Sequence, residues 1–229
     1  MTVAASAENF QTFGVSREGR PVQGRLFPGR NVDAPARRIL VVGGIHGDEP
    51  ASVDAVLEWG AGLAARGSAS SLWLLPAGNP DGLAAGRKNN AADVDLNRNF
   101  PARNFTRAHG PGYDPGPTPL SEPETALLAR LVAEASIDAI VAVHAPFACV
   151  NFDGPARAWA AAVATACGWP VRENIGYPTP GSLGSWWGGD RDLPILTLEL
   201  PAGPLEFFRP QALAALNRAI DYWDPSVPL

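Results

Sequence analysis

The sequence is poor in the residues that mark several common classes of protein. Only two cysteines, Cys149 and Cys167, occur among 229 residues, which excludes a disulfide framework. Charged residues make up 18%, and acidic residues outnumber basic ones by 23 to 18, which disfavours nonspecific binding to nucleic acid or an anionic membrane. No apolar run is long enough to span a bilayer, and residues 1–14 lack the features of a secretory signal. We therefore expect a cytoplasmic protein with no nucleic-acid or membrane partner.

What the sequence does contain is a large apolar fraction and many loop-forming residues. Hydrophobic residues reach 46%, which is enough for a sizeable core. The 24 glycines and 23 prolines indicate shaped loops on a rigid scaffold, as enzymes often have. No repeat, low-complexity tract or linker divides the chain, so we expect residues 1–229 to form a single domain.

Apolar periodicity predicts that strands and helices alternate along the chain. Strands are predicted at residues 39–42, 72–75, 138–144 and 193–200, with weaker candidates at 23–27 and 149–152. Helices are predicted at residues 51–65, 121–135, 155–167 and 210–223. This order predicts a parallel or mixed sheet covered by helices. Ser121 is the expected N-cap of its helix, with Glu124 at the capping-box position.

One long stretch, residues 77–119, has neither helical nor strand periodicity. It contains the turn signal Asn79-Pro80-Asp81-Gly82. An irregular segment of this length inside a compact domain is usually functional.

Two of the three histidines stand where a predicted strand ends. His46 follows the strand at 39–42, with Glu49 three residues later, and His144 ends the strand at 138–144, whereas His109 lies in a loop rich in Gly and Pro. Open α/β sheets place ligands at the carboxyl ends of their strands, and two histidines with one glutamate are the ligand set of catalytic zinc in peptidases. The alternative interpretation is a Gly-rich turn in which Glu49 caps a helix.

A single carboxylate, Glu199, interrupts the apolar strand at 193–200. If the strand alternates, Thr197 and Glu199 share one face and the neighbouring leucines the other. Burial of this carboxylate is costly unless it is paired or functional, and near a metal it would suit a general base. The alternative is an edge strand with one wet face.

The irregular segment also carries candidate substrate-binding residues. Asn97 and Arg98 follow Asp95, and arginine suits bidentate binding of a carboxylate. Arg87 and Lys88 add positive charge nearby, although solvated loop charge would explain each equally well. Asp95 could accept the second ring N–H of a metal-binding histidine.

Together these motifs resemble the zinc carboxypeptidases of the carboxypeptidase A clan. The resemblance rests on the ordered set His46-Gly47-Asp48-Glu49, Asn79-Pro80-Asp81-Gly82, residues 95–101 (DLNRNFP), residues 121–125 (SEPET), His144 and Glu199. Residues 144–149 (HAPFAC) and 177–186 (YPTPGSLGSW) are similar to the murein peptide amidase group within that clan. The resemblance implies a three-layer α/β/α sandwich on a mixed, mostly parallel sheet of about eight strands.

For the metal centre, the resemblance implies one zinc ion held by His46, Glu49 and His144. It implies that Glu199 acts as general base and then as general acid. Asp95 matches the acid that lies behind the first zinc histidine. The reaction implied is hydrolysis of a C-terminal amide bond, as in the release of meso-diaminopimelate from murein tripeptide.

For the substrate, the resemblance implies a small peptide with a free C-terminal carboxylate. Asn97 and Arg98 match the pair that holds this carboxylate, Arg87 matches the arginine that polarises the scissile carbonyl, and Tyr177 matches a mobile tyrosine that closes over the substrate. Gly184 falls where larger carboxypeptidases place a side chain that selects the C-terminal residue, which implies a roomy pocket.

The resemblance leaves some features of the chain open. Ala145 follows His144 where the murein amidases are expected to carry an acid. Asp190, Arg191 and Asp192 are candidates for binding the second amino-acid centre of diaminopimelate. Two alternatives remain, a hydrolase of small N-acyl amino acids from the desuccinylase and aspartoacylase branch, and an inactive module that binds peptidoglycan fragments.

Overall fold

An eight-stranded sheet forms the centre of the computed structural model, which describes residues 10–30 and 37–224. Its strand order is β1-β2-β4-β3-β5-β8-β6-β7. The strands are β1 (Gln11–Val15), β2 (Pro21–Phe27), β3 (Arg38–Val42), β4 (Ser71–Leu75), β5 (Ala139–His144), β6 (Phe147–Asp153), β7 (Val171–Arg172) and β8 (Ile195–Pro201).

The middle of the sheet is parallel. Strands β4, β3, β5 and β8 run in the same direction, and β2 and β6 flank them in the opposite direction. The outer strand β1 pairs antiparallel with β2, and β7 pairs parallel with β6. The prediction of a mixed, mostly parallel sheet is therefore confirmed.

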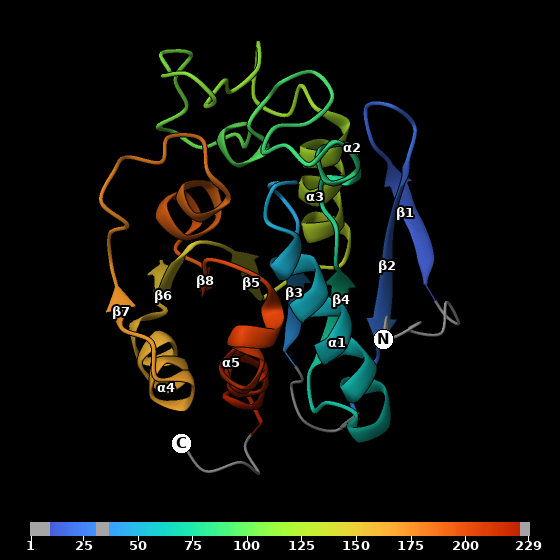
Figure 1. Ribbon diagram of the computed structural model, residues 1–229, viewed down its shortest axis with the longest axis vertical. Helices are drawn as coiled ribbons and strands as arrows, with labels where there is room; N and C mark the ends of the chain where they lie inside the picture. The colour runs from blue at the N-terminus through green and yellow to red at the C-terminus, as the bar shows by residue number, and fades with distance from the viewer. Residues whose placement is uncertain (1–9, 31–36, 225–229) are drawn as a thin grey trace.

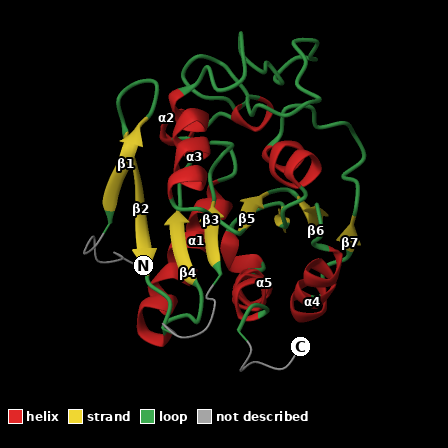
Figure 2. Cartoon of the chain, turned by 180° about the vertical axis from the view of Figure 1, so that it is seen from behind, coloured by secondary structure: helices red, strands yellow, loops and turns green. Residues whose placement is uncertain are grey.

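Helices cover both faces of this sheet (Figures 1 and 2). They are α1 (Pro50–Arg66), α2 (Pro80–Ala85), α3 (Pro123–Glu134), α4 (Arg157–Cys167) and α5 (Arg209–Asp221), with short helical turns η1 (Leu96–Arg98), η2 (Ser185–Gly189) and η3 (Leu205–Phe207). Buried side chains of α1, α4 and α5 belong to one core cluster, and those of α3 and η2 belong to another. The fold is a three-layer α/β/α sandwich.

Strand β3 shows how the sequence builds both cores at once. Ile39 and Val41 lie in the cluster with α1, α4 and α5, whereas Leu40 and Val42 lie in the cluster with α3. All four are fully buried, because a central strand with helices on both faces has no wet side. Each such side chain contributes up to about 1.5–3 kcal/mol of burial free energy. These cores fix the position of the loops that follow the strands.

Two local predictions are wrong. Asn79-Pro80-Asp81-Gly82 begins helix α2, with Asn79 as N-cap accepting a hydrogen bond from the Gly82 N–H at 2.8 Å. The N-cap of α3 is Glu122, not Ser121, and the Glu122 side chain makes no capping hydrogen bond. The residue before a proline is held in an extended conformation, so Pro123 moves the start of the helix one residue past Ser121 and removes the capping box.

The described part of the chain contains no helix that is both long and apolar enough to cross a membrane.

Candidate active site

The irregular segment between β4 and α3 lies over the carboxyl ends of the central strands (Figure 1). His46 follows β3, His144 is the last residue of β5, and Glu199 lies on β8. Because β5 pairs with β3 on one side and β8 on the other, these three side chains belong to adjacent strands. His144 and Glu199 are direct register partners. Residues separated by 153 positions therefore meet at one edge of the sheet.

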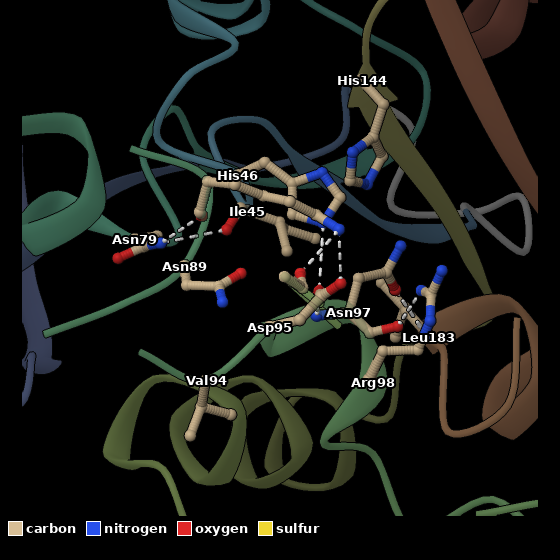
Figure 3. Close-up of polar contacts among 12 residues, drawn as sticks. Ile45, His46, Asn79, Asn89, Val94, Asp95, Asn97, Arg98, His144 and Leu183 are labelled. Atoms are coloured by element: carbon tan, nitrogen blue, oxygen red, sulfur yellow. Dashed lines mark hydrogen bonds and ion pairs between the residues drawn. The ribbon is translucent and has the colours of Figure 1, made fainter. Parts of the chain in front are cut away.

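His46, Glu49 and His144 converge on one point (Figure 3 shows both histidines). Glu49 Oε1 lies 2.7 Å from His46 Nδ1, and Glu49 Oε2 lies 3.0 Å from His144 Nδ1. The ligand atoms of the three residues all lie within 4.8 Å of one another. Two imidazole nitrogens and one carboxylate oxygen that face the same point are the donor set of an open zinc site. The residues present therefore fit a zinc ion.

Glu49 occupies the N-cap position of α1, but its side chain makes no capping hydrogen bond. The carboxylate instead faces the two histidines and also accepts the Ala145 N–H at 3.2 Å. The alternative interpretation of Glu49 as a helix cap is therefore wrong. Ser52 Oγ donates to the Glu49 carbonyl at 2.7 Å and fixes the backbone of the turn.

Asp95 lies beside His46 (Figure 3) and contacts the opposite ring nitrogen from the one that contacts Glu49. Its Oδ1 lies 3.1 Å from His46 Nε2, which fixes the ring so that Nδ1 faces the cluster. Burial alone would raise the pKa of Asp95, but the hydrogen bond with His46 and the charges of His46, Arg98 and Lys88 lower this pKa. Burial alone would lower the pKa of His46, and its bonds to Asp95 and Glu49 raise it to about 9.

Glu199 is buried on a central strand, so the alternative of a wet edge strand is wrong. The expected alternation is confirmed, because Leu196, Leu198 and Leu200 lie in the core while Thr197 and Glu199 line a cavity. Burial raises the pKa of Glu199, the positive charge of His144 opposes this, and Glu49 adds to it. Within the described residues, Glu199 Oε2 has no hydrogen-bond partner. A carboxylate in this state is suited to accept and return a proton.

Of the two adjacent basic residues in the irregular segment, only Lys88 points toward the cluster. Lys88 Nζ lies 2.7 Å from Asp95 Oδ2 and 3.7 Å from the centre of the Tyr113 ring. Arg87 is exposed, and its backbone N–H bonds to the Gly82 carbonyl inside the same loop. Among the described residues, the Arg87 side chain makes no contact with the histidine cluster, whereas Lys88 contacts the acid behind His46, and the role expected for Arg87 stays a prediction.

Asn97 and Arg98 lie beside the histidine cluster (Figure 3). Asn97 Oδ1 accepts the Leu183 N–H at 2.9 Å, which leaves its amide NH2 to donate into the cavity that Asn97 lines. Arg98 is 4% exposed, and its guanidinium donates to the Asn97 carbonyl at 2.6 Å and lies 5.3 Å from the centre of the Tyr113 ring. Both groups are held by backbone contacts in positions suited to an anionic ligand.

Tyr177 lies at the border of two adjoining cavities, both of which it lines. Its ring centre is 6.2 Å from those of Tyr113 and Phe147, and the side chain is 37% exposed. Burial raises the pKa of the phenol, and the charge of Arg98 opposes this. The phenol therefore stays protonated at neutral pH and is available as a hydrogen-bond donor.

The first cavity, of about 210 Å³, runs from Glu199 and His144 along β8 and β6. Gly184 lines it, as expected for a roomy pocket, but the space beside Gly184 is already taken by Asp153 Oδ2. Asp153 is a residue that the sequence patterns did not single out. The signal that would have found it is the period of two that it shares with Cys149 and Asn151 on a strand next to Glu199.

Three other candidates lie away from this cavity. Asp190 Oδ2 accepts the backbone N–H of Arg103, and the Arg191 guanidinium lies over the Trp186 ring, 4.0 Å from its centre. Neither these residues nor Asp192 lines the cavity next to Glu199. The structure therefore does not bring them to the substrate site.

Comparison with known proteins identifies the family of this chain. Residues 5–153 fit the model of the family described as zinc carboxypeptidase. The chain belongs to the zinc carboxypeptidase family and is a hydrolytic enzyme of a zinc-dependent class. The matched segment contains His46, Glu49, Asp95 and His144 but ends before Glu199.

Three relatives extend the comparison over most of the chain. Murein peptide amidase A of Escherichia coli K12 is 35% identical over 177 residues, which cover 71% of this chain and 70% of the relative. Murein peptide amidase A of Vibrio campbellii is 33% identical over 213 residues, or 83% of this chain and 78% of the relative. The crystal structure of murein-tripeptide amidase MpaA from Escherichia coli O157 superposes with a TM-score of 0.73 at 28% identity, covering 92% of each chain.

Proposed function

We propose that this chain is a zinc-dependent metallocarboxypeptidase that releases the C-terminal residue of a small peptide, namely meso-diaminopimelate from murein tripeptide in the cytoplasm. The observation that carries the proposal is the convergence of His46, Glu49 and His144, the last of which lines a cavity together with Glu199. The choice of substrate is supported by the murein peptide amidases of Escherichia coli and Vibrio campbellii, which the chain resembles over most of its length.

One zinc ion held by the two histidines and Glu49 would polarise the scissile carbonyl and lower the pKa of a bound water toward neutrality. Asp95 keeps His46 in the tautomer whose Nδ1 lone pair faces the cluster. Lys88, on the other oxygen of Asp95, supplies positive charge on the same side of the site. In this proposal Lys88 takes the part that the family resemblance assigned to Arg87.

Glu199 performs the proton transfers. Its unpartnered Oε2 accepts a proton from the attacking water, and the same oxygen then gives that proton to the nitrogen of the leaving amine. Because the side chain is buried beside His144, little solvent competes for the proton. A positioned acid–base group of this kind contributes about 10²–10⁴-fold to the rate.

Asn97 and Arg98 define the enzyme as an exopeptidase. The Asn97 amide NH2 and the Arg98 guanidinium would donate to the free carboxylate of the terminal residue. A longer chain has no carboxylate at this point, so only a terminal residue binds productively. The phenol of Tyr177, between the two cavities, donates a hydrogen bond to the bound peptide.

The test is release of free diaminopimelate from L-alanyl-γ-D-glutamyl-meso-diaminopimelate by zinc-loaded protein, detected by mass spectrometry. Glu199→Gln should retain zinc and lose about 10²–10⁴-fold in kcat. The matched control is Glu173→Gln, since Glu173 lines the same cavity but is ion-paired with Arg157. N-Succinylglutamate and N-acetylaspartate, assayed in parallel, test the N-acyl amino acid alternative. Near-normal turnover by Glu199→Gln would remove the assigned base, and cleavage of the N-acyl substrates alone would overturn the proposal.

A further inference from the structure

The carboxylate of Asp153 lies in the cavity beside Glu199, at the end farthest from the histidines. Strands β6 and β8 are antiparallel, with Cys149 opposite Glu199 and Asp153 opposite Ile195. Side chains two residues apart on a strand share a face. Asp153 therefore projects from the same face of the sheet as Glu199, and both residues line the cavity.

Two glycines of the segment around η2 leave the space that the Asp153 side chain occupies. A Cβ atom at Gly184 would lie 2.3 Å from Asp153 Oδ2, and one at Gly188 would lie 2.4 Å from Asp153 Cβ. Real Cβ atoms do not approach other atoms so closely, so each position excludes any larger residue unless Asp153 moves. The absence of a side chain at Gly184 thus admits a carboxylate from the neighbouring strand and does not simply enlarge the pocket.

This carboxylate has no protein partner. Asp153 makes no hydrogen bond or ion pair through its side chain among the described residues, and burial raises its pKa. The cavity is lined, within the same described part of the chain, by the acids Asp153, Glu173 and Glu199 and by no lysine or arginine. Glu173 is ion-paired with Arg157, and Glu199 serves the reaction. A partly desolvated carboxylate without a cation is unfavourable until a ligand supplies one.

We propose that Asp153 is the residue that selects the substrate, by pairing with an ammonium group on the side chain of the C-terminal residue. This inference rests on the proposed function and adds to it the group that discriminates between terminal residues. For meso-diaminopimelate, the ammonium is that of the second amino-acid centre. Charge-assisted pairs of this type are short and strong where water is excluded.

The length of the cavity suits such a ligand. Glu199 and Ile195 are four residues apart on β8, so Asp153 is roughly 13 Å from Glu199 along the strands, at about 3.3 Å per residue. An extended side chain from the scissile carbonyl to the second amino group of diaminopimelate covers roughly 8 Å. The remaining distance of roughly 5 Å corresponds to one polar contact of about 3 Å at each end, between the ammonium and Asp153 and between the scissile carbonyl and Glu199. A short side chain would leave Asp153 without its cation.

The experiment compares two substrates that differ only in this ammonium group. The γ-D-glutamyl peptides of meso-diaminopimelate and of L-2-aminopimelate share the distal carboxylate, and only the first carries the second amine. Wild-type protein should prefer the first peptide in kcat/KM. Asp153→Asn should lower kcat/KM for it by about 30-fold or more, with little change for the second. Glu173→Gln is the matched control, and it should keep the wild-type preference.

The ratio of the two kcat/KM values does not depend on the fraction of active protein, so partial misfolding of a variant does not affect it. An unchanged ratio in Asp153→Asn, while the wild type releases diaminopimelate, would overturn the role of Asp153 and leave the proposed function intact. If the wild type cleaves neither peptide, the proposed function fails. The role of Asp153 is then tested by calorimetry, which measures the binding of free meso-diaminopimelate and free L-2-aminopimelate. Tighter binding of diaminopimelate by the wild type that is lost in Asp153→Asn supports the inference. Equal binding of the two amino acids by the wild type overturns it.

Discussion

Replacing Asp95 with asparagine removes the negative charge behind His46 with almost no change in shape. Asp95 is fully buried, and its Oδ1 lies 3.1 Å from His46 Nε2 and 2.9 Å from the Asn97 nitrogen. An asparagine oxygen at the same place keeps both hydrogen bonds. What disappears is the charge that polarises the imidazole and pairs with Lys88 Nζ at 2.7 Å. The substitution therefore keeps the hydrogen bond to His46 and removes the negative charge together with the oxygen that accepts from Lys88.

The expected loss of zinc affinity is about 10–100-fold, the usual effect of removing a group that supports a metal-binding histidine. This corresponds to about 1.4–2.7 kcal/mol. Competition with a chromophoric zinc chelator at pH 7.5 measures the affinity directly, without reference to turnover. A loss of kcat/KM should accompany it only at zinc concentrations that do not saturate the variant.

The matched control is Asp93→Asn, two residues away in the same loop. Asp93 is exposed and accepts hydrogen bonds from the Asn89 amide instead of contacting the histidines. Its positive φ of 62° also suits asparagine. If Asp95→Asn, folded by circular dichroism, binds zinc as tightly as Asp93→Asn, the idea that Asp95 tunes the first ligand is refuted.

Two further predictions concern the irregular segment. Lys88→Met should lower kcat/KM about a hundredfold, as removal of a transition-state cation does, while Arg87→Met should stay within about twofold. Equal effects of the two substitutions in steady-state kinetics would contradict the role proposed for Lys88. Asp81→Asn should lower the free energy of unfolding by about 1–3 kcal/mol at pH 7, because Asp81 accepts from Ser16 Oγ and pairs with Arg20. Burial would raise the pKa of Asp81, but these contacts lower it. The stability they supply is therefore present above about pH 4 and lost below it, and urea titrations from pH 7 to 3 should show the two proteins converging.

The positions of the strands and of the metal cluster could be predicted because they depend on simple periodicity. The strands that became β3 and β5 are nearly continuous apolar runs, as buried parallel strands are, whereas β8 alternates leucines with Thr197 and Glu199. Polar residues at the ends of such runs meet at one edge of the sheet. His46, His144 and Glu199 could therefore be placed together before their distances were known.

The choice between Arg87 and Lys88 could not be made in this way. They are neighbours in a segment without helical or strand period, so no rule assigns either of them a direction. The direction depends on the turn after α2, where the Arg87 N–H bonds to the Gly82 carbonyl and the Lys88 carbonyl accepts from Gly47. These are contacts between loops, which local sequence patterns do not predict.

Asp153 was missed for a different reason. Its strand, β6, was only weakly predicted, and its pairing with β8 joins residues 42 or more positions apart. The face on which Asp153 lies becomes meaningful only once Cys149 is known to lie opposite Glu199. Local patterns carry no information about such a register. The same limitation led to the candidates Asp190, Arg191 and Asp192, which are close to Gly184 in sequence but turn away from the cavity.

The irregular segment is rigid because three fully buried asparagines take the place of secondary structure in it. Asn79 bonds to the backbone of Ile45, Gly82 and Lys88. Asn90 accepts from the N–H groups of Ala92 and Val94 and donates to Glu122 and Glu124. Asn99 bonds to the backbone of Pro115, Thr118 and Glu122.

Each proposed binding residue of this segment lies next to one of these three anchors or between two of them. Lys88 and Asp95 fall on either side of Asn90, and Arg98 directly precedes Asn99. Buried amides of this kind must satisfy all their hydrogen bonds in one arrangement, so the backbone between them has little freedom. The charged groups around His46 are therefore held in place before substrate arrives, which is the condition for electrostatic stabilisation without reorganisation. A sequence segment that has no periodic pattern of its own thus becomes the most tightly specified part of the site.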